Sequence, residues 1–186
     1  MHESQYEDVV RLLAAKAESS PMGPGIDEAS LLGPLQNPAQ FAIVKRLVDD
    51  ARDRGARIVT GGEPAPELGA NFYRATIVAD ATDGMPLVDE EQFGPALPII
   101  KYGDVEDAIR AANALDAALG ASVWSDDPAA AREVALRLQA GTVWINKHGG
   151  IHPLVPFGGI KGSGYGLEFG VEGLKSVAVP TVVTSR

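Results

Sequence analysis

Two histidines of this sequence stand at a spacing that can do chemistry. His148 and His152 are four residues apart, which is a metal-binding spacing when a helix carries both rings on one face. Gly149, Gly150 and Pro153 surround them, so we expect no helix there, and the chain has no cysteine that could add a ligand. The sequence therefore predicts no metal site.

A glycine-rich run at residues 157–166 is the second candidate, and it suggests a nucleotide-binding loop. The order Lys161-Gly162 differs from the Gly-Lys-Ser/Thr order that holds phosphates in a P-loop. Gly162, Gly164 and Gly166 also lack the final spacing of a dinucleotide-binding fingerprint, which needs a strand leading directly into a helix. The pattern alone favours glycines that let the backbone pack closely against a neighbour.

An acidic run, Asp89-Glu90-Glu91, precedes Phe93 and a Gly-Pro pair and is the third candidate. Such runs are typical of a solvated surface. A carboxylate two residues before an aromatic ring, followed by a turn into a buried strand, can instead aim Glu91 and Phe93 into one cleft. The pattern by itself leaves both interpretations open.

Composition limits the classes of protein to which the chain can belong. It has 186 residues, a formal net charge of −9 and 45% hydrophobic residues, which favours one folded domain, or one domain and a small appendage. The absence of cysteine excludes disulfides, thiolate metal sites and a thiol nucleophile from these residues. The acidic balance disfavours nucleic-acid binding. No apolar run could span a membrane and no signal peptide opens the sequence, so we expect a cytoplasmic protein.

The periodicity of apolar residues predicts the elements that would position these groups. Amphipathic helices are predicted after a Ser4–Glu7 capping box and from Asn37. Further on, strands at 57–60, 72–79, 97–102, 121–124 and 142–146 alternate with helices after Asp104 and Asp127. This alternation predicts an α/β fold, a three-layer domain with a mostly parallel sheet. Within these strands, Trp124 and Trp144 are predicted to be core residues.

The last part of the chain departs from this alternation. Residues 149–173 contain nine glycines and are predicted to be mostly loop. Residues 176–184 are rich in β-branched side chains and are predicted to form a terminal strand, which Pro180 restricts to an edge position or an isolated ribbon. An edge strand outside the main sheet is typical of pairing with another subunit.

Five motifs in a fixed order resemble the C-terminal part of the NAD(P)-dependent aldehyde dehydrogenase superfamily. The most specific is Glu-Glu-x-Phe-Gly-Pro at residues 90–95, and the other four lie at residues 33–35, 55–62, 141–146 and 156–164. The resemblance covers nearly the whole chain. It implies that residues 1–173 are the C-terminal portion of the catalytic domain and that residues 174–186 are an oligomerisation strand or tail.

The resemblance also implies roles for particular residues. Glu91 would accept hydrogen bonds from the nicotinamide ribose of NAD or NADP, and Phe93 would pack beside the nicotinamide. Gly158, Gly159 and Lys161 match a loop near the active site. The aldehyde substrate would contact a set of residues in the loop that follows the last apolar strand, namely Asn146, His148, Leu154 and Phe157.

The family mechanism, as the resemblance implies it, oxidises an aldehyde to a carboxylic acid through a cysteine thiohemiacetal, with a glutamate as base. The matching cysteine, base and Rossmann-type domain are outside this chain, which is therefore expected to be inactive alone. Two alternatives stay open: a non-catalytic binding or assembly module, and one half of a split enzyme. In the intact enzyme we expect a homo-oligomer formed through the C-terminal strand.

Overall fold

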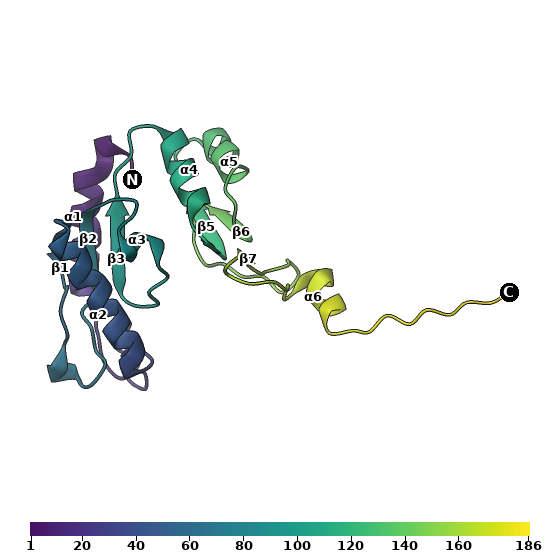
Figure 1. Cartoon of the computed structure of the whole chain (residues 1–186), viewed down its shortest axis with the longest axis horizontal. Coiled ribbons are helices and arrows are strands. Elements are labelled where there is room, and N and C mark those ends of the chain that lie inside the picture. The colour runs from purple at the N-terminus through teal and green to yellow at the C-terminus, as the bar shows by residue number, and fades with distance from the viewer. The chain divides into compact units, whose positions relative to one another are not determined.

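A computed structural model describes residues 1–186, and most of its helices and strands are labelled in Figure 1. The chain divides into two units, Met1–Asp107 and Ala108–Arg186. The first unit contains η1 (Glu3–Gln5), α1 (Tyr6–Ser19), α2 (Pro38–Asp53), β1 (Arg57–Thr60), η2 (Pro66–Leu68), β2 (Thr76–Ala81), α3 (Pro86–Asp89) and β3 (Ala96–Ile100). The second contains most of α4 (Val105–Ala114), then β4 (Ala117–Ala118), β5 (Gly120–Val123), α5 (Pro128–Ala135), β6 (Thr142–Ile145), β7 (Ile160–Lys161) and α6 (Gly170–Ser176).

Short polar side chains start several helices, as their sequence positions predict. Asn37 Oδ1 accepts from the Gln40 backbone N–H at 2.8 Å and caps α2. Asp127 caps α5 in the same way, and Asp104 accepts from the Glu106 N–H ahead of α4. The predicted Ser4–Glu7 capping box is wrong, because η1 occupies residues 3–5 and His2 accepts from the Ser4 N–H.

The sheet of the first unit is covered on both faces, which gives three layers. Its strand order is β1-β2-β3, with β1 antiparallel and β3 parallel to the central strand β2. On β2, Ile77 and Ala79 join a buried cluster with Tyr6 and Val10 of α1. Val78 and Ala81 join the other cluster, which α2 contributes to. The predicted α/β class with three layers is therefore confirmed in this unit.

Tyr6 ties helix α1 to the sheet through its hydroxyl group. The hydroxyl donates to the Ile99 carbonyl oxygen at 2.9 Å and accepts from the Asp80 N–H at 2.6 Å. Burial raises the pKa of Tyr6 above its ordinary value, and the side chain is 1% exposed. The N-terminal helix is thus fixed to two strands, β3 and the last part of β2.

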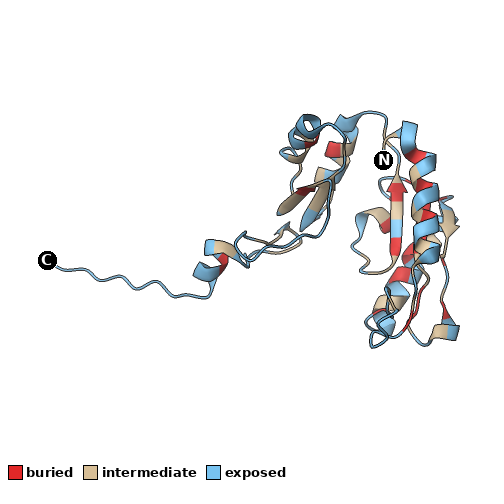
Figure 2. Cartoon of the chain, turned by 180° about the vertical axis from the view of Figure 1, so that it is seen from behind, coloured by how far each residue is buried: buried red, intermediate tan, exposed pale blue.

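The second unit carries smaller sheets. Strands β5 and β6 are parallel and are joined by α5, whereas β4 and β7 form a short antiparallel pair. The residues after α6, at 177–186, form no strand within the chain, and Figure 2 shows this tail as exposed. No helix has both the length and the apolar character needed to cross a bilayer.

Two details of the predicted core and strands are corrected by the structure. Trp144 is buried as predicted, but the prediction for Trp124 is wrong, because this side chain is 64% exposed beyond the end of β5. The strand predicted at 72–79 begins only at Thr76, since Tyr73 instead bridges to Pro64 in the preceding loop.

Candidate functional site

The turn between α3 and β3 forms a cleft that we call the β3 cleft. Its volume is about 370 Å³, and both Glu91 and Phe93 line it. The remaining lining residues come from α3, the turn and β3: Leu87, Val88, Glu90, Gln92, Gly94, Ala96, Leu97 and Pro98. The structure thus places on one cleft the two side chains predicted to contact a cofactor.

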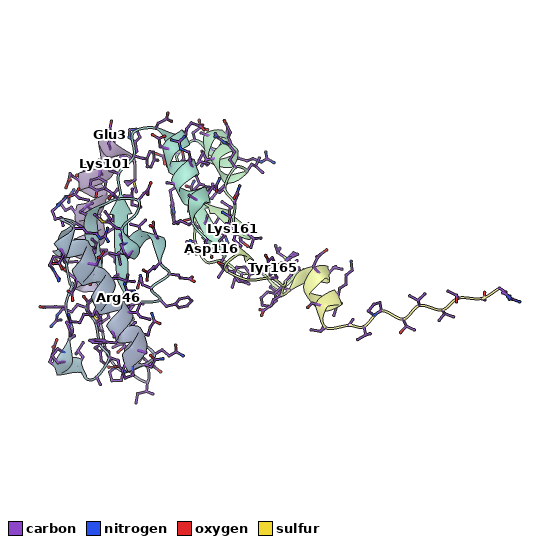
Figure 3. The ribbon with its side chains drawn as sticks, in the orientation of Figure 1. Glu3, Arg46, Lys101, Asp116, Lys161 and Tyr165 are labelled. Carbon is purple, nitrogen blue, oxygen red and sulfur yellow. The ribbon has the colours of Figure 1, made fainter.

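Neighbouring carboxylates of the acidic run have different surroundings. Glu90 Oε2 lies 2.8 Å from Arg46 Nη2, in an ion pair at the surface. Figure 3 labels Arg46 on helix α2. Glu91 is exposed on the cleft and makes neither an ion pair nor a hydrogen bond. Its carboxylate oxygens are therefore available as acceptors for a ligand that carries hydroxyl groups.

The turn lies tightly against helix α2. A Cβ atom built on Gly94 would come 2.4 Å from Val44 Cγ2 and 3.1 Å from Leu35 Cδ2, so only glycine fits this position without a shift. Phe93, directly before it, has a left-handed backbone with φ of 43° and a ring that is 74% exposed. The ring is thus presented to the cleft and is not part of the core.

A second hollow, the β6 cavity, belongs to the other unit and has a volume of about 410 Å³. Strand β6 and the loop after it supply its mostly apolar lining: Thr142, Val143, Trp144, Ile145, Lys147, Gly150, Ile151, His152, Val155, Pro156 and Phe157. Lys147 and His152 are its ionisable side chains, and no carboxylate lines it. The Trp144 indole N–H donates to the Gly150 carbonyl at 2.8 Å and fixes the loop to the strand.

Of the four residues predicted to contact substrate, only Phe157 lines the β6 cavity. The His148 ring stands edge-on to Trp144 at 5.0 Å, and Leu154 is 79% exposed outside the lining. The Asn146 side chain is engaged with the backbone of Ser125, donating to its carbonyl and accepting from its N–H, both at 2.9 Å. The Asn146 side chain thereby fixes the Ser125 backbone beyond the end of β5, and contact of these three with substrate stays a prediction.

Several lining residues were absent from the sequence prediction. Leu97 of the β3 cleft lies two residues beyond the motif at 90–95, and that proximity could have identified it, because the strand is apolar throughout and shows no alternation. Ile151, His152 and Val155 of the β6 cavity lie in a loop without periodicity, where the sequence offers no comparable signal.

Lys161 has a structural partner at the end of helix α4. Its ammonium group donates to the carbonyl oxygens of Asn113 at 2.7 Å and Leu115 at 3.2 Å (Figure 3). A cation at a helix C-terminus is favourable because the last carbonyls carry partial negative charge. This use of the ammonium group accords with the rejection of a P-loop.

The glycines of this region permit close backbone contacts, as their pattern predicts. A Cβ on Gly141 would come 1.7 Å from the Gly158 carbonyl oxygen, and one on Gly158 would come 2.2 Å from the Gly166 carbonyl oxygen. The three backbones therefore pack directly on one another, which only residues without a side chain allow.

Both the sequence and the structure of this chain are similar to those of known aldehyde dehydrogenases. The sequence is 36% identical to phenylacetaldehyde dehydrogenase of Pseudomonas fluorescens, over 94% of this chain and 35% of that protein. It is 41% identical to betaine aldehyde dehydrogenase of Cereibacter sphaeroides, over 85% of this chain and 32% of that protein. The NAD⁺ complex of aldehyde dehydrogenase from Bacillus cereus superposes with a TM-score of 0.87 at 36% identity, covering 93% of this chain and 35% of that one.

The chain thus spans about a third of the length of these relatives. The profile of the aldehyde dehydrogenase family matches residues 1–183. That match extends over nearly every element described above, including the β3 cleft and the β6 cavity. The chain therefore belongs to the aldehyde dehydrogenase family.

Proposed function

We propose that this chain supplies the nicotinamide-binding wall and part of the aldehyde channel of an enzyme that oxidises an aldehyde to a carboxylic acid with NAD. The observation that carries the proposal is the β3 cleft, where a free carboxylate and an exposed aromatic ring occur within the family's most specific motif. The catalytic-domain portion would be residues 1–173 and the tail residues 174–186.

The groups on the β3 cleft fit the nicotinamide riboside part of such a cofactor. Glu91 would accept hydrogen bonds from ribose hydroxyls, and Phe93 would provide a flat apolar wall beside the pyridine ring. When bound, NAD⁺ supplies the hydride acceptor for the oxidation. The NAD⁺ complex of the Bacillus cereus relative supports NAD over NADP.

The thiol step of the reaction requires residues that this chain does not contain. Its 186 residues include no cysteine, so the nucleophile would come from another segment or another chain. We infer that the isolated chain reduces no NAD with any aldehyde. A split enzyme, in which a partner carries the cysteine, is one form of this proposal.

The lining of the β6 cavity disfavours a positively charged aldehyde. A trimethylammonium group needs carboxylates or an aromatic cage, and this lining has no carboxylate. The Trp144 indole is 7% exposed, which leaves little of its face for a cation. Lys147 adds positive charge at the cavity, and this would repel a cationic substrate.

A chimeric enzyme tests the proposal. The chain would replace the matching C-terminal third of the Bacillus cereus enzyme, and formation of NADH would be followed with phenylacetaldehyde. We expect activity, and we expect Glu91→Gln to raise the KM for NAD about tenfold, because charge-assisted hydrogen bonds are lost. Glu28→Gln is the matched control, since Glu28 is exposed and lines no part of the β3 cleft.

Two results would contradict the proposal. A correctly folded chimera that forms no NADH would refute the enzymatic function. An unchanged KM for NAD in Glu91→Gln, equal to that of Glu28→Gln, would refute the assignment of the β3 cleft.

The tail supports an additional role in assembly, in which two copies of the chain pair through residues 176–184. Four valines of this segment, Val177, Val179, Val182 and Val183, are 83–90% exposed, which is unfavourable for an apolar segment in water. Removal of residues 177–186 should lower the molar mass measured by light scattering to that of the monomer. A full-length chain that is already monomeric would refute this role.

A further inference from the structure

We propose that Gln40 and Gln92 form a clamp that holds Phe93 in its left-handed conformation and thereby sets the direction of Glu91 and Phe93. Gln40 lies in the first turn of α2, and Gln92 lies in the turn before β3. Both are positioning residues, which act by setting the direction of Glu91 and Phe93 on the β3 cleft. Their importance for cofactor binding rests on the proposed function, whereas the clamp itself does not.

The first half of the clamp begins at the cap of helix α2. Asn37 fixes the backbone of Gln40 by accepting from its N–H at 2.8 Å. The half-buried side chain of Gln40 then donates from Nε2 to the backbone carbonyl of Gln92. The residue directly before Phe93 is therefore attached to a capped helix end.

The second half of the clamp spans the turn itself. Gln92 Nε2 donates to the Ala96 carbonyl oxygen at 2.7 Å, so this side chain bridges residues 93–95. The Pro95 carbonyl accepts from the Thr76 N–H of β2 at 2.7 Å and fixes the far end of the turn to the sheet. The turn is thus held on both sides of Phe93.

Phe93 needs such external support because its own contacts are few. A left-handed backbone is unfavourable for a residue with a bulky side chain. The ring is 74% exposed, so burial of the ring cannot compensate for that conformation. The hydrogen bonds of the two glutamines are therefore what selects the conformation at this position.

Gln40→Glu removes the donor with little other change. The residue is the third of helix α2, where glutamate is favourable as part of a capping box, so the helix itself is not weakened. The introduced carboxylate would face the Gln92 carbonyl without a proton to donate. The matched control is Gln36→Glu, which makes the same change at an exposed side chain beside the same cap.

Fluorine NMR of the 186-residue chain labelled with 4-fluorophenylalanine gives a local readout. Its five phenylalanines should give five signals, and loss of one in Phe93→Leu assigns the signal of Phe93. We expect a single narrow Phe93 signal in the wild type, and a shifted or split one in Gln40→Glu and in Gln92→Leu. The other four signals, and every signal of Gln36→Glu, should be unchanged.

Binding of nicotinamide mononucleotide, titrated through the same signal, separates the clamp from the proposed function. Loss of one hydrogen bond should weaken this binding roughly fivefold in Gln40→Glu. A Phe93 signal that is the same in both glutamine variants as in the wild type would overturn the clamp. Loss of all five signals in both variants would also overturn the clamp, because the two glutamines would then contribute to general stability and not to the conformation of Phe93. A shifted Phe93 signal without binding by the wild type would support the clamp and contradict the proposed function.

Discussion

Replacement of Gly94 by alanine tests how closely the functional turn is packed against helix α2. The added Cβ would lie 2.4 Å from Val44 Cγ2, 2.9 Å from Gln92 Oε1 and 3.1 Å from Leu35 Cδ2. Val44 is fully buried in a helix, where a β-branched side chain has one favoured rotamer, so it cannot turn away. The turn itself must therefore move.

The expected cost follows from two opposing effects. Overpacking of this kind costs about 1–3 kcal/mol in the free energy of unfolding. Alanine also restricts the unfolded chain relative to glycine, which offsets about 0.4–1 kcal/mol where the backbone angles are permitted. The φ of Gly94 is not positive, so this offset applies. We expect Gly94→Ala to destabilise the first unit by about 1–2 kcal/mol.

A double-mutant cycle with Val44→Ala isolates the contact. Val44→Ala alone should cost about 1.5–3 kcal/mol through lost burial and the cavity it leaves. In the double variant the new methyl group occupies part of that cavity, so the total cost should be about that of Val44→Ala alone. The coupling should therefore be about 1–2 kcal/mol in the favourable direction.

Urea unfolding followed through the fluorine signals of Phe41 and Phe72 measures these energies, because both lie in the first unit. Tryptophan fluorescence is unsuitable, since Trp124 and Trp144 both lie in the second unit. If the double variant costs as much as the sum of Gly94→Ala and Val44→Ala, within about 0.5 kcal/mol, the contact between the two residues is refuted. A Gly94→Ala variant as stable as the wild type would also refute it.

Three further predictions concern other parts of the chain. Lys161→Met should destabilise the second unit by about 1–2 kcal/mol in urea unfolding followed by tryptophan fluorescence, because the carbonyls of Asn113 and Leu115 lose their charged hydrogen-bond donor. Lys175→Met removes an exposed cation of the last turn of α6 and should change the free energy of unfolding by less than about 0.5 kcal/mol. Burial raises the pKa of Tyr73 to about 12 and its hydroxyl has no partner, so the folded state holds this proton more tightly than the unfolded one. The wild type should therefore lose stability as the pH rises from about 10 to about 12 in thermal melts, and Tyr73→Phe should lack this part of the loss while matching or exceeding wild-type stability at neutral pH. In the chimeric enzyme, kcat/KM for phenylacetaldehyde should exceed kcat/KM for betaine aldehyde. Lys147→Glu should lower the ratio of these two values, because the positive charge that repels the cationic substrate is replaced by a negative one. A ratio that is unchanged in Lys147→Glu would contradict the charge argument.

The helix starts were predictable because their signals are local. Asn37 and Asp127 each accept from a backbone N–H within three residues, so the sequence contains both partners of the bond side by side. Trp124 was misplaced because its exposure depends on what covers the end of β5, which an apolar strand pattern does not report. The late start of β2 has a similar cause, since Tyr73 pairs with Pro64 in a loop.

The candidate site was predictable in part for the same reason. Glu91 and Phe93 are two residues apart, and a turn between them and a strand suffices to bring them to one cleft. The bond from Gln40 to Gln92 joins residues 52 positions apart, and that from Lys161 to Asn113 joins residues 48 apart. Neither pair has a spacing that points to the other, so such contacts appear only once the chain is folded.

The direct backbone contacts of Gly141, Gly158 and Gly166 limit which substitutions the chain can accept during evolution. At Gly94 the obstacle to a larger residue is a side chain, so a second substitution at Val44 could compensate for the first. At Gly141 and Gly158 the obstacles are the carbonyl oxygens of Gly158 and Gly166, which no substitution can remove. Compensating side-chain changes can therefore arise around the turn beside α2 but not around Gly141 and Gly158, and we expect these two positions to tolerate no replacement in any variant of the chain that keeps the fold. Gly166 is restricted for a different reason, since its φ of 118° is unfavourable for a residue with a side chain.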